Sequence, residues 1–105
     1  GAGYVSNRIL LIEDTTFDMV SLGGLDTRAI SITENNAEIT LRNCRFVRYN
    51  GTDYKSVYTS SSNVKIYAFN CVSYTPIEDA SPGATMEVLP ANEFKYYNTL
   101  SDYVR

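Results

Sequence analysis

The residues of this chain that could do chemistry are two thiols and a set of carboxylates, because histidine is absent. The chain has 105 residues, two cysteines and no His. The absence of His removes the commonest general base and the commonest zinc ligand, and with them any Ser-His-Asp or Cys-His arrangement. Each cysteine follows an asparagine, in the pairs Asn43-Cys44 and Asn70-Cys71, which are 27 residues apart.

The two Asn-Cys pairs belong to a longer internal repeat. Residues 27–49 align without a gap on residues 54–76, and this alignment superimposes the two pairs. Two shorter segments fit the same frame, residues 10–17 at a spacing of 29 and residues 94–101 at a spacing of 28. One position of the shared unit is then occupied by Asp14, Asn43, Asn70 and Asn98.

Each repeat unit alternates apolar and polar residues with a period of two, which predicts short strands separated by turns. Ile39 and Leu41 alternate with polar neighbours, and Asn, Gly and Asp are frequent between the runs. One unit cannot bury its apolar face alone, but units stacked in parallel share a continuous core. We therefore predict an all-β solenoid of about four coils of 27–29 residues, with three short strands per coil and no helix of useful length.

Stacking would turn the shared positions into columns. The corner column would hold the Asn and Asp side chains, because asparagine tolerates a left-handed corner and can bond to the next coil. Cys44 and Cys71 are expected to point inward as reduced thiols. A disulfide between them is the alternative, because a Cα separation of about 4.8 Å lies within the allowed range. We expect no metal site and no cofactor, since two thiols alone do not complete a closed site.

The segments ITLRNCRF (39–46) and VKIYAFNC (64–71) resemble coils of the right-handed parallel β-helix of the pectate-lyase-like superfamily. The resemblance covers residues from about 7 to 103 and implies a single β-helix domain over residues 1–105, a segment of a longer or oligomeric protein. Members include pectin-degrading enzymes, other polysaccharide lyases and hydrolases, and bacteriophage tailspikes. The local motifs of the pectinases are not found, so the resemblance is greatest to a tailspike or appendage segment.

A pair of glutamates forms the candidate catalytic set. The repeat frame places Glu38, Lys65 and Glu93 in one outward column, with the acids about 9.6 Å apart by strand spacing. This separation is close to the roughly 6.5–9.5 Å of inverting glycosidases. Lys65 between the acids favours the ionised form of both, so we expect a solvent-exposed charge ladder and no cleavage by this chain alone.

Aromatic side chains are the candidates for binding. Their position in the alternation places Tyr67, Phe69 and Tyr97 outward on one face, and Tyr74 is a further candidate in a loop. Exposed rings of this kind serve either as an interface with another subunit or as a platform on which sugar rings stack.

Charge and length restrict the partners. The net charge is −3 without a basic stripe, which argues against nucleic acid, and no apolar run is long enough for membrane insertion. Four coils make a small core with open strand edges, so we expect a homotrimer or attachment to the rest of a longer β-helix. The expected function is glycan-binding display in a phage tailspike or similar fibre on a virion tail or extracellular surface. The alternatives are a polysaccharide depolymerase fragment, either lyase or glycoside hydrolase, and a purely structural trimerisation or stalk module.

Overall fold

The computed structural model describes residues 3–5, 8–18, 28–47, 55–74 and 76–96, and these residues form an all-β structure. Their only helix is a 3-10 turn, η1 (Ala91–Glu93). The strands are β1 (Gly3–Val5), β2 (Ile9–Glu13), β3 (Thr16–Asp18), β4 (Arg28–Ile32), β5 (Glu38–Arg42), β6 (Arg45–Val47), β7 (Lys55–Thr59), β8 (Val64–Phe69), β9 (Cys71–Ser73), β10 (Ile77–Asp79), β11 (Met86–Leu89) and β12 (Phe94–Tyr96).

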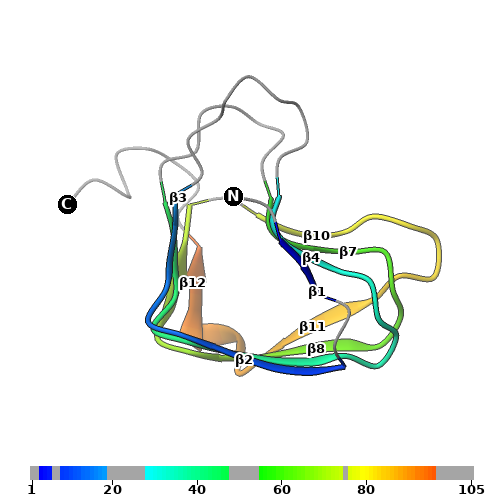
Figure 1. Ribbon diagram of the computed structural model, residues 1–105, viewed down its shortest axis with the longest axis horizontal. Helices are drawn as coiled ribbons and strands as arrows, with labels where there is room; N and C mark the ends of the chain where they lie inside the picture. Colours follow the sequence, from blue (N-terminus) through cyan, green and yellow to red (C-terminus); the bar gives the residue numbers. More distant parts are fainter. Residues whose placement is uncertain (1–2, 6–7, 19–27, 48–54, 75, 97–105) are drawn as a thin grey trace.

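Each strand pairs with the strand three positions later in the chain, and all of these pairs are parallel. Sheet A has the order β1-β4-β7-β10, sheet B has β2-β5-β8-β11, and sheet C has β3-β6-β9-β12. The chain thus passes through sheets A, B and C in turn and then returns to sheet A; we call three such successive strands a circuit. Figure 1 shows the three sheets as three sides around a common interior. The predicted all-β class and parallel pairing are confirmed.

The predicted register is confirmed for the first three circuits. Arg28 pairs with Lys55, and Ile39 pairs with Ile66, as the spacing of 27 requires. Leu10 pairs with Ile39 at the predicted spacing of 29.

The register predicted for the last segment is wrong. Met86 of β11 pairs with Val64 at a spacing of 22, and Phe94 pairs with Cys71 at a spacing of 23, so the spacing to the last circuit is shorter than the predicted 28. The sequence frame had placed Phe94 on sheet B, whereas β11 occupies that position and Phe94 lies on sheet C. Tyr97 and Asn98 lie outside the described residues.

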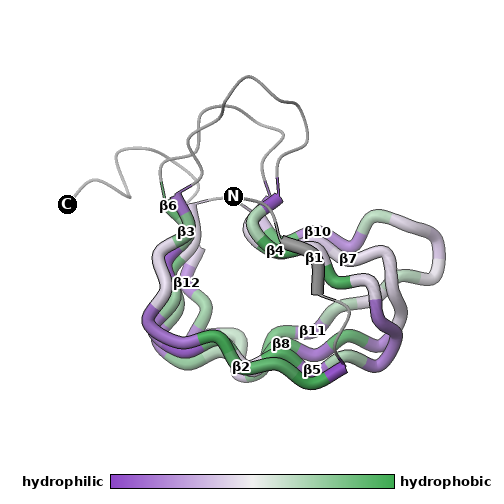
Figure 2. Tube along the Cα trace, viewed as in Figure 1, coloured by the Kyte–Doolittle hydropathy of each residue, from purple (hydrophilic) through white to green (hydrophobic). Residues whose placement is uncertain are grey.

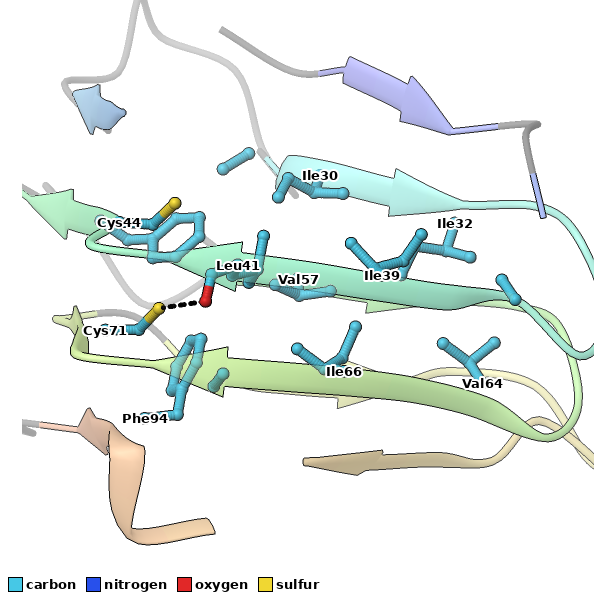
Figure 3. Close-up of a cluster of buried hydrophobic side chains, with 14 residues drawn as sticks. Ile30, Ile32, Ile39, Leu41, Cys44, Val57, Val64, Ile66, Cys71 and Phe94 are labelled. Carbon is cyan, nitrogen blue, oxygen red and sulfur yellow. Dashed lines mark hydrogen bonds between the residues drawn. The ribbon is translucent and has the colours of Figure 1, made fainter. Parts of the chain in front are cut away.

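The interior between the sheets is filled by the inward residues of the alternating pattern. Ile39 and Leu41 of β5 and Ile66 of β8 are fully buried, and Figure 3 shows Ile39 above Ile66 on neighbouring strands. On sheet C the rings of Phe17 and Phe46 stack with centroids 4.8 Å apart. Burying such side chains is worth about 1.5–3 kcal/mol each, so stacking equivalent residues provides the main driving force for the fold.

The corner between sheets B and C is a column of left-handed residues. Asp14, Asn43 and Asn70 have φ angles of 52°, 55° and 55°. The amide of Asn43 donates to Asp14 Oδ1 at 2.9 Å, and that of Asn70 donates to Asn43 Oδ1 at 2.8 Å. The predicted corner column is therefore confirmed for three of its four members, because asparagine both accepts the positive φ and links successive circuits.

A second asparagine column lies at the corner between sheets A and B. Asn36 and Asn63 have φ angles of 62° and 59°, and Asn63 donates its amide to Asn36 Oδ1 at 2.8 Å. The repeat alignment had matched these two residues without giving them a role. Both turning points that flank sheet B are thus fixed in the same way, which holds this sheet in register at its two ends.

Replacement of Asn43 tests the corner column. Asn43→Ala removes two hydrogen bonds and places alanine in a left-handed conformation, so we expect a loss of about 2–4 kcal/mol in the free energy of unfolding. Asn43→Gly removes the bonds but tolerates the backbone, and should lose about half as much. Urea melts provide the measurement, with Glu38→Ala on the exposed face as a control within about 0.5 kcal/mol of the wild type. Equal losses in the alanine and glycine variants would contradict the backbone argument.

Candidate functional site

The outer face of sheet B carries the outward side chains of four paired strands and forms a grid, which we call the B face. Strand pairing arranges these side chains in three columns that cross the strands. The first column is Ile9, Glu38, Lys65 and Glu87; the middle column is Leu11, Thr40, Tyr67 and Leu89; and the third column is Glu13, Arg42 and Phe69. Among the residues that the sequence analysis singled out for chemistry or binding, the B face carries Glu38, Lys65, Tyr67 and Phe69.

The candidate catalytic pair is not brought together. Glu38 pairs with Lys65 as predicted, but the next residue of this column is Glu87, not Glu93. Glu93 lies in η1 and its carboxylate accepts a hydrogen bond from the backbone N–H of Asn70 at 2.8 Å. The shorter spacing to the last circuit is the cause, because it places Glu87 beside Lys65 and leaves Glu93 in the turn. Two acids separated by a lysine on an exposed face form a charge ladder and do not enclose the water that an inverting hydrolase needs.

The aromatic candidates occupy three different environments. Tyr67 is half-buried in the middle column, while Phe69 is 39% exposed and its ring lies under the Arg42 guanidinium, 4.9 Å from the centroid. Tyr74 is only 2% exposed, so its candidacy as a surface residue is wrong. Arg42 also forms an ion pair with Glu13 at 3.4 Å, which completes a continuous Glu13-Arg42-Phe69 ladder. Arg42 therefore occupies one face of the Phe69 ring, on which a sugar could otherwise stack.

The two thiols lie inside the protein and carry no exposed chemistry. Cys44 and Cys71 are buried and free. The thiol of Cys71 donates to the carbonyl of Leu41 at 3.3 Å, the contact drawn in Figure 3, and that of Cys44 donates to the carbonyl of Ile12 at 3.5 Å. The predicted inward orientation is confirmed. Burial raises the pKa of the Cys44 thiol above its usual value, so its reactive thiolate form is disfavoured.

Side chains close the B–C corner column at both of its ends. Within the column, the N–H of Asp14 donates to the carbonyl of Arg42 and that of Asn43 donates to the carbonyl of Phe69, each at 2.8 Å. At Asn70 the acceptor is instead the Glu93 carboxylate. At the other end, the hydroxyl of Thr15 donates to the carbonyl of Glu13 at 2.8 Å, where the later circuits have cysteines.

In the other asparagine column, too, a side-chain oxygen replaces the backbone carbonyl as acceptor at the last position. The N–H of Asn36 donates to the carbonyl of Ser62 at 2.9 Å, but that of Asn63 donates to Thr85 Oγ1 at 2.7 Å. Both columns therefore end, on the β10–β12 side, in a side-chain acceptor. Sequence reasoning missed these roles of Thr85 and Glu93, although the proline at position 90 and the loss of the period after Thr75 signalled a changed last unit.

A small polar hollow lies beside the closed corner. Its volume is about 190 Å³ and its lining includes Asn70, Asn92, Glu93 and Lys95. Asn92 and Lys95 are exposed, whereas Glu93 is held by the Asn70 N–H. The amide, ammonium and carboxylate groups provide both donors and acceptors around one opening, which suits a ligand rich in hydroxyl groups. The sequence analysis identified Asn70 and Glu93 among these residues, but did not predict that they line a common hollow.

A second hollow is the end of the core. Its volume is about 360 Å³ and it is lined by apolar residues of the last circuit, including Ile77, Val88 and Phe94, with Tyr96 at its edge. These are the inward positions of β10, β11 and β12, so the hollow continues the stacked interior and presents no group that could do chemistry.

No metal-binding cluster of three or more His, Cys, Asp or Glu residues is found in the described part of the chain. Among these residues there is also no helix of the length and apolarity that a membrane span requires. Comparisons with protein-family models, with curated proteins and with solved structures found no match to this chain. The resemblance to pectate-lyase-like proteins and tailspikes therefore stays a prediction.

The hydrogen bond from the Asn70 N–H to the Glu93 carboxylate gives a prediction about stability. Glu93→Ala removes the acceptor of the Asn70 N–H, and we expect a loss of about 1 kcal/mol and faster hydrogen exchange at that amide. Glu93→Gln keeps an oxygen acceptor, so it should stay within about 0.5 kcal/mol of the wild type. Equal exchange rates at Asn70 in the alanine variant and the wild type would contradict the proposed cap.

Because of the Cys44 thiol, we expect the free energy of unfolding to fall in alkaline solution. Its pKa is raised in the folded protein, so the unfolded chain releases the proton first as the pH rises past about 8.5. The stability contribution is thus fully present below that pH and is lost above it. Urea midpoints between about pH 7 and pH 9.5 should fall more steeply in the wild type than in Cys44→Ala. Parallel pH profiles of the two proteins would show that the thiol does not contribute.

Proposed function

We propose that this chain is a right-handed parallel β-helix that forms a rigid segment of a surface-recognition fibre of the bacteriophage tailspike kind. In such a fibre it displays a glycan-binding site and does not itself cleave polysaccharide. The observation that carries this proposal is the pair of asparagine columns, which link successive circuits at both ends of sheet B. Columns of this kind give a stack whose circuits cannot slip relative to one another, and rigidity favours display because little entropy is lost on binding.

The polar hollow is the proposed glycan site. Asn92 and Lys95 present side-chain donors at its mouth, and Glu93 supplies acceptor oxygens beside the Asn70 corner. A volume of about 190 Å³ is below the roughly 300–1,000 Å³ of sites for drug-sized ligands, so the hollow suits one sugar residue of a polymer. Affinity would then come from repeated sites along an assembled fibre, in the way that multivalent binding compensates for weak single contacts.

A depolymerase activity is less well supported by the geometry. The B face holds Glu38 and Glu87 on either side of Lys65, and Glu93 is committed to the Asn70 corner. Hydrolysis needs one carboxylic acid kept protonated near neutral pH while the other is ionised. Glu38 and Glu87 are both exposed and both lie beside Lys65, so the geometry of the B face does not assign them separate roles.

Binding to a panel of capsular and cell-wall polysaccharides tests the proposal. We expect one class of glycan to bind, and Asn92→Ala or Lys95→Ala to weaken this binding about tenfold, the usual scale for one lost hydrogen bond to a charged or polar partner. Glu34→Ala, at an exposed turn away from the hollow, is the matched control and should bind like the wild type.

Three results would overturn this assignment. Binding that is unchanged in both hollow variants would place the glycan elsewhere on the chain. A shortening of the polysaccharide that disappears in Glu38→Gln or Glu93→Gln would favour the depolymerase alternative. Absence of binding to every glycan would favour the purely structural stalk module.

A further inference from the structure

We propose that the B face is a docking surface for a second copy of this chain. The two copies are related by a two-fold axis that runs parallel to the columns. Its middle column is mostly apolar, and each outer column combines charged residues with one large apolar residue, Ile9 or Phe69. Leu11 in the middle column is 54% exposed and Ile9 beside it is 74% exposed, although both lie on a regular strand. In Figure 2 most of the trace of β2 has the colour of hydrophobic residues. Exposed aliphatic side chains in a contiguous patch mark an interaction site.

The charges on the two outer columns are complementary under this symmetry. An axis parallel to the columns brings each strand opposite the same strand of the second copy, and it brings the first column opposite the third. Glu38 then faces Arg42 of the second copy, and Lys65 faces Phe69 of the second copy. No like charges meet. The middle column faces itself, so that Leu11, Tyr67 and Leu89 bury one another at the centre.

The reversed arrangement, with the axis along the strands, is less favourable. It would place Glu38 opposite Lys65 and Arg42 opposite Phe69. Arginine binds a carboxylate through two parallel hydrogen bonds, whereas lysine offers a single point charge. The arrangement that places Arg42 opposite Glu38 therefore makes better use of the charged groups on this surface.

The closed columns also favour docking by the side over docking end to end. Added circuits would need the corner N–H and carbonyl groups, but Glu93, Thr85 and Thr15 already bond to these groups. The side chains of the B face have no such competing partners apart from the Glu13-Arg42-Phe69 ladder. A second copy can thus join without breaking a backbone hydrogen bond.

The size of the surface predicts a weak association. Four strands about 4.8 Å apart, each about five residues of roughly 3.3 Å, span a flat area of roughly 300 Å² per copy. Interfaces that bury less than about 1,200 Å² in total belong to the weak or transient class. Self-association should therefore be visible at high protein concentration and should gain strength in a fibre, where neighbouring segments hold the copies together.

A charge swap tests the proposal with the intact chain. Sedimentation equilibrium should show reversible self-association of the wild type. Arg42→Glu places two acids opposite each other and Glu38→Arg places two bases opposite each other, so each should weaken association at least roughly tenfold. The double variant Glu38→Arg/Arg42→Glu restores opposite charges and should return association to within about threefold of the wild type.

The rescue reports a contact between copies because the two residues cannot reach each other within one chain. Glu38 and Arg42 are the first and last residues of β5, about 13 Å apart along the strand. Arg45→Glu, in the outward column of sheet C, is the matched control and should leave association unchanged. Urea midpoints of all variants verify that each monomer is folded.

The outcomes are separable from those of the glycan test, since Asn92 and Lys95 lie outside the B face and the inference does not depend on the proposed glycan site. A wild type that remains monomeric at the highest soluble concentration would overturn the proposal. So would an oligomer in which the double swap fails to restore what either single swap removes. The proposal is supported if each single swap weakens association and the double variant restores it.

Discussion

The structure depends on one constraint, which is that the chain must turn between sheets without interrupting the parallel hydrogen bonding from circuit to circuit. A turn of this kind needs a left-handed residue, and most residues with a Cβ avoid that conformation, whereas glycine, asparagine and aspartate adopt it more readily. Asparagine meets the constraint and adds a side chain that bonds along the stack, as Asn43 does to Asp14. Glycine would accept the angle but would leave each corner without a link, so the choice of residue fixes both the turn and the register.

The rest of the fold follows from that register. Once the corners are aligned, equivalent apolar residues such as Ile39 and Ile66 lie on neighbouring strands, and the core forms by stacking like on like. The same alignment applies to the outer surface, where it produces columns instead of scattered charges. Glu13, Arg42 and Phe69 form a ladder because the corner beside them holds their strands in register. Surface chemistry and core packing therefore have a single cause.

Much of this could be predicted from sequence where the repeat is regular. The Asn43-Cys44 and Asn70-Cys71 pairs gave the spacing, the parallel pairing and the inward thiols, because each depends on a local pattern repeated without a gap. The last circuit could not be predicted in the same way. Phe94 matches Ile66 weakly at a spacing of 28, whereas the last strands pair at spacings of 22 and 23, at which the sequence has little similarity to the other units. Tyr74 was misplaced because parity along a strand does not report whether a loop position is buried.

The change in the last circuit is also what separates the two proposed surfaces. A regular fourth unit would have continued the corner column with another asparagine and would have kept its acid on the B face. The shorter spacing instead makes Glu93 an acceptor for the Asn70 N–H, with the polar hollow beside it. The irregular end of the stack then offers donors and acceptors to a hydroxyl-rich ligand, whereas the regular face offers a periodic surface that another copy can match. A regular surface favours self-association because both copies carry side chains at the same spacing. The irregular last circuit favours a ligand that lacks this spacing.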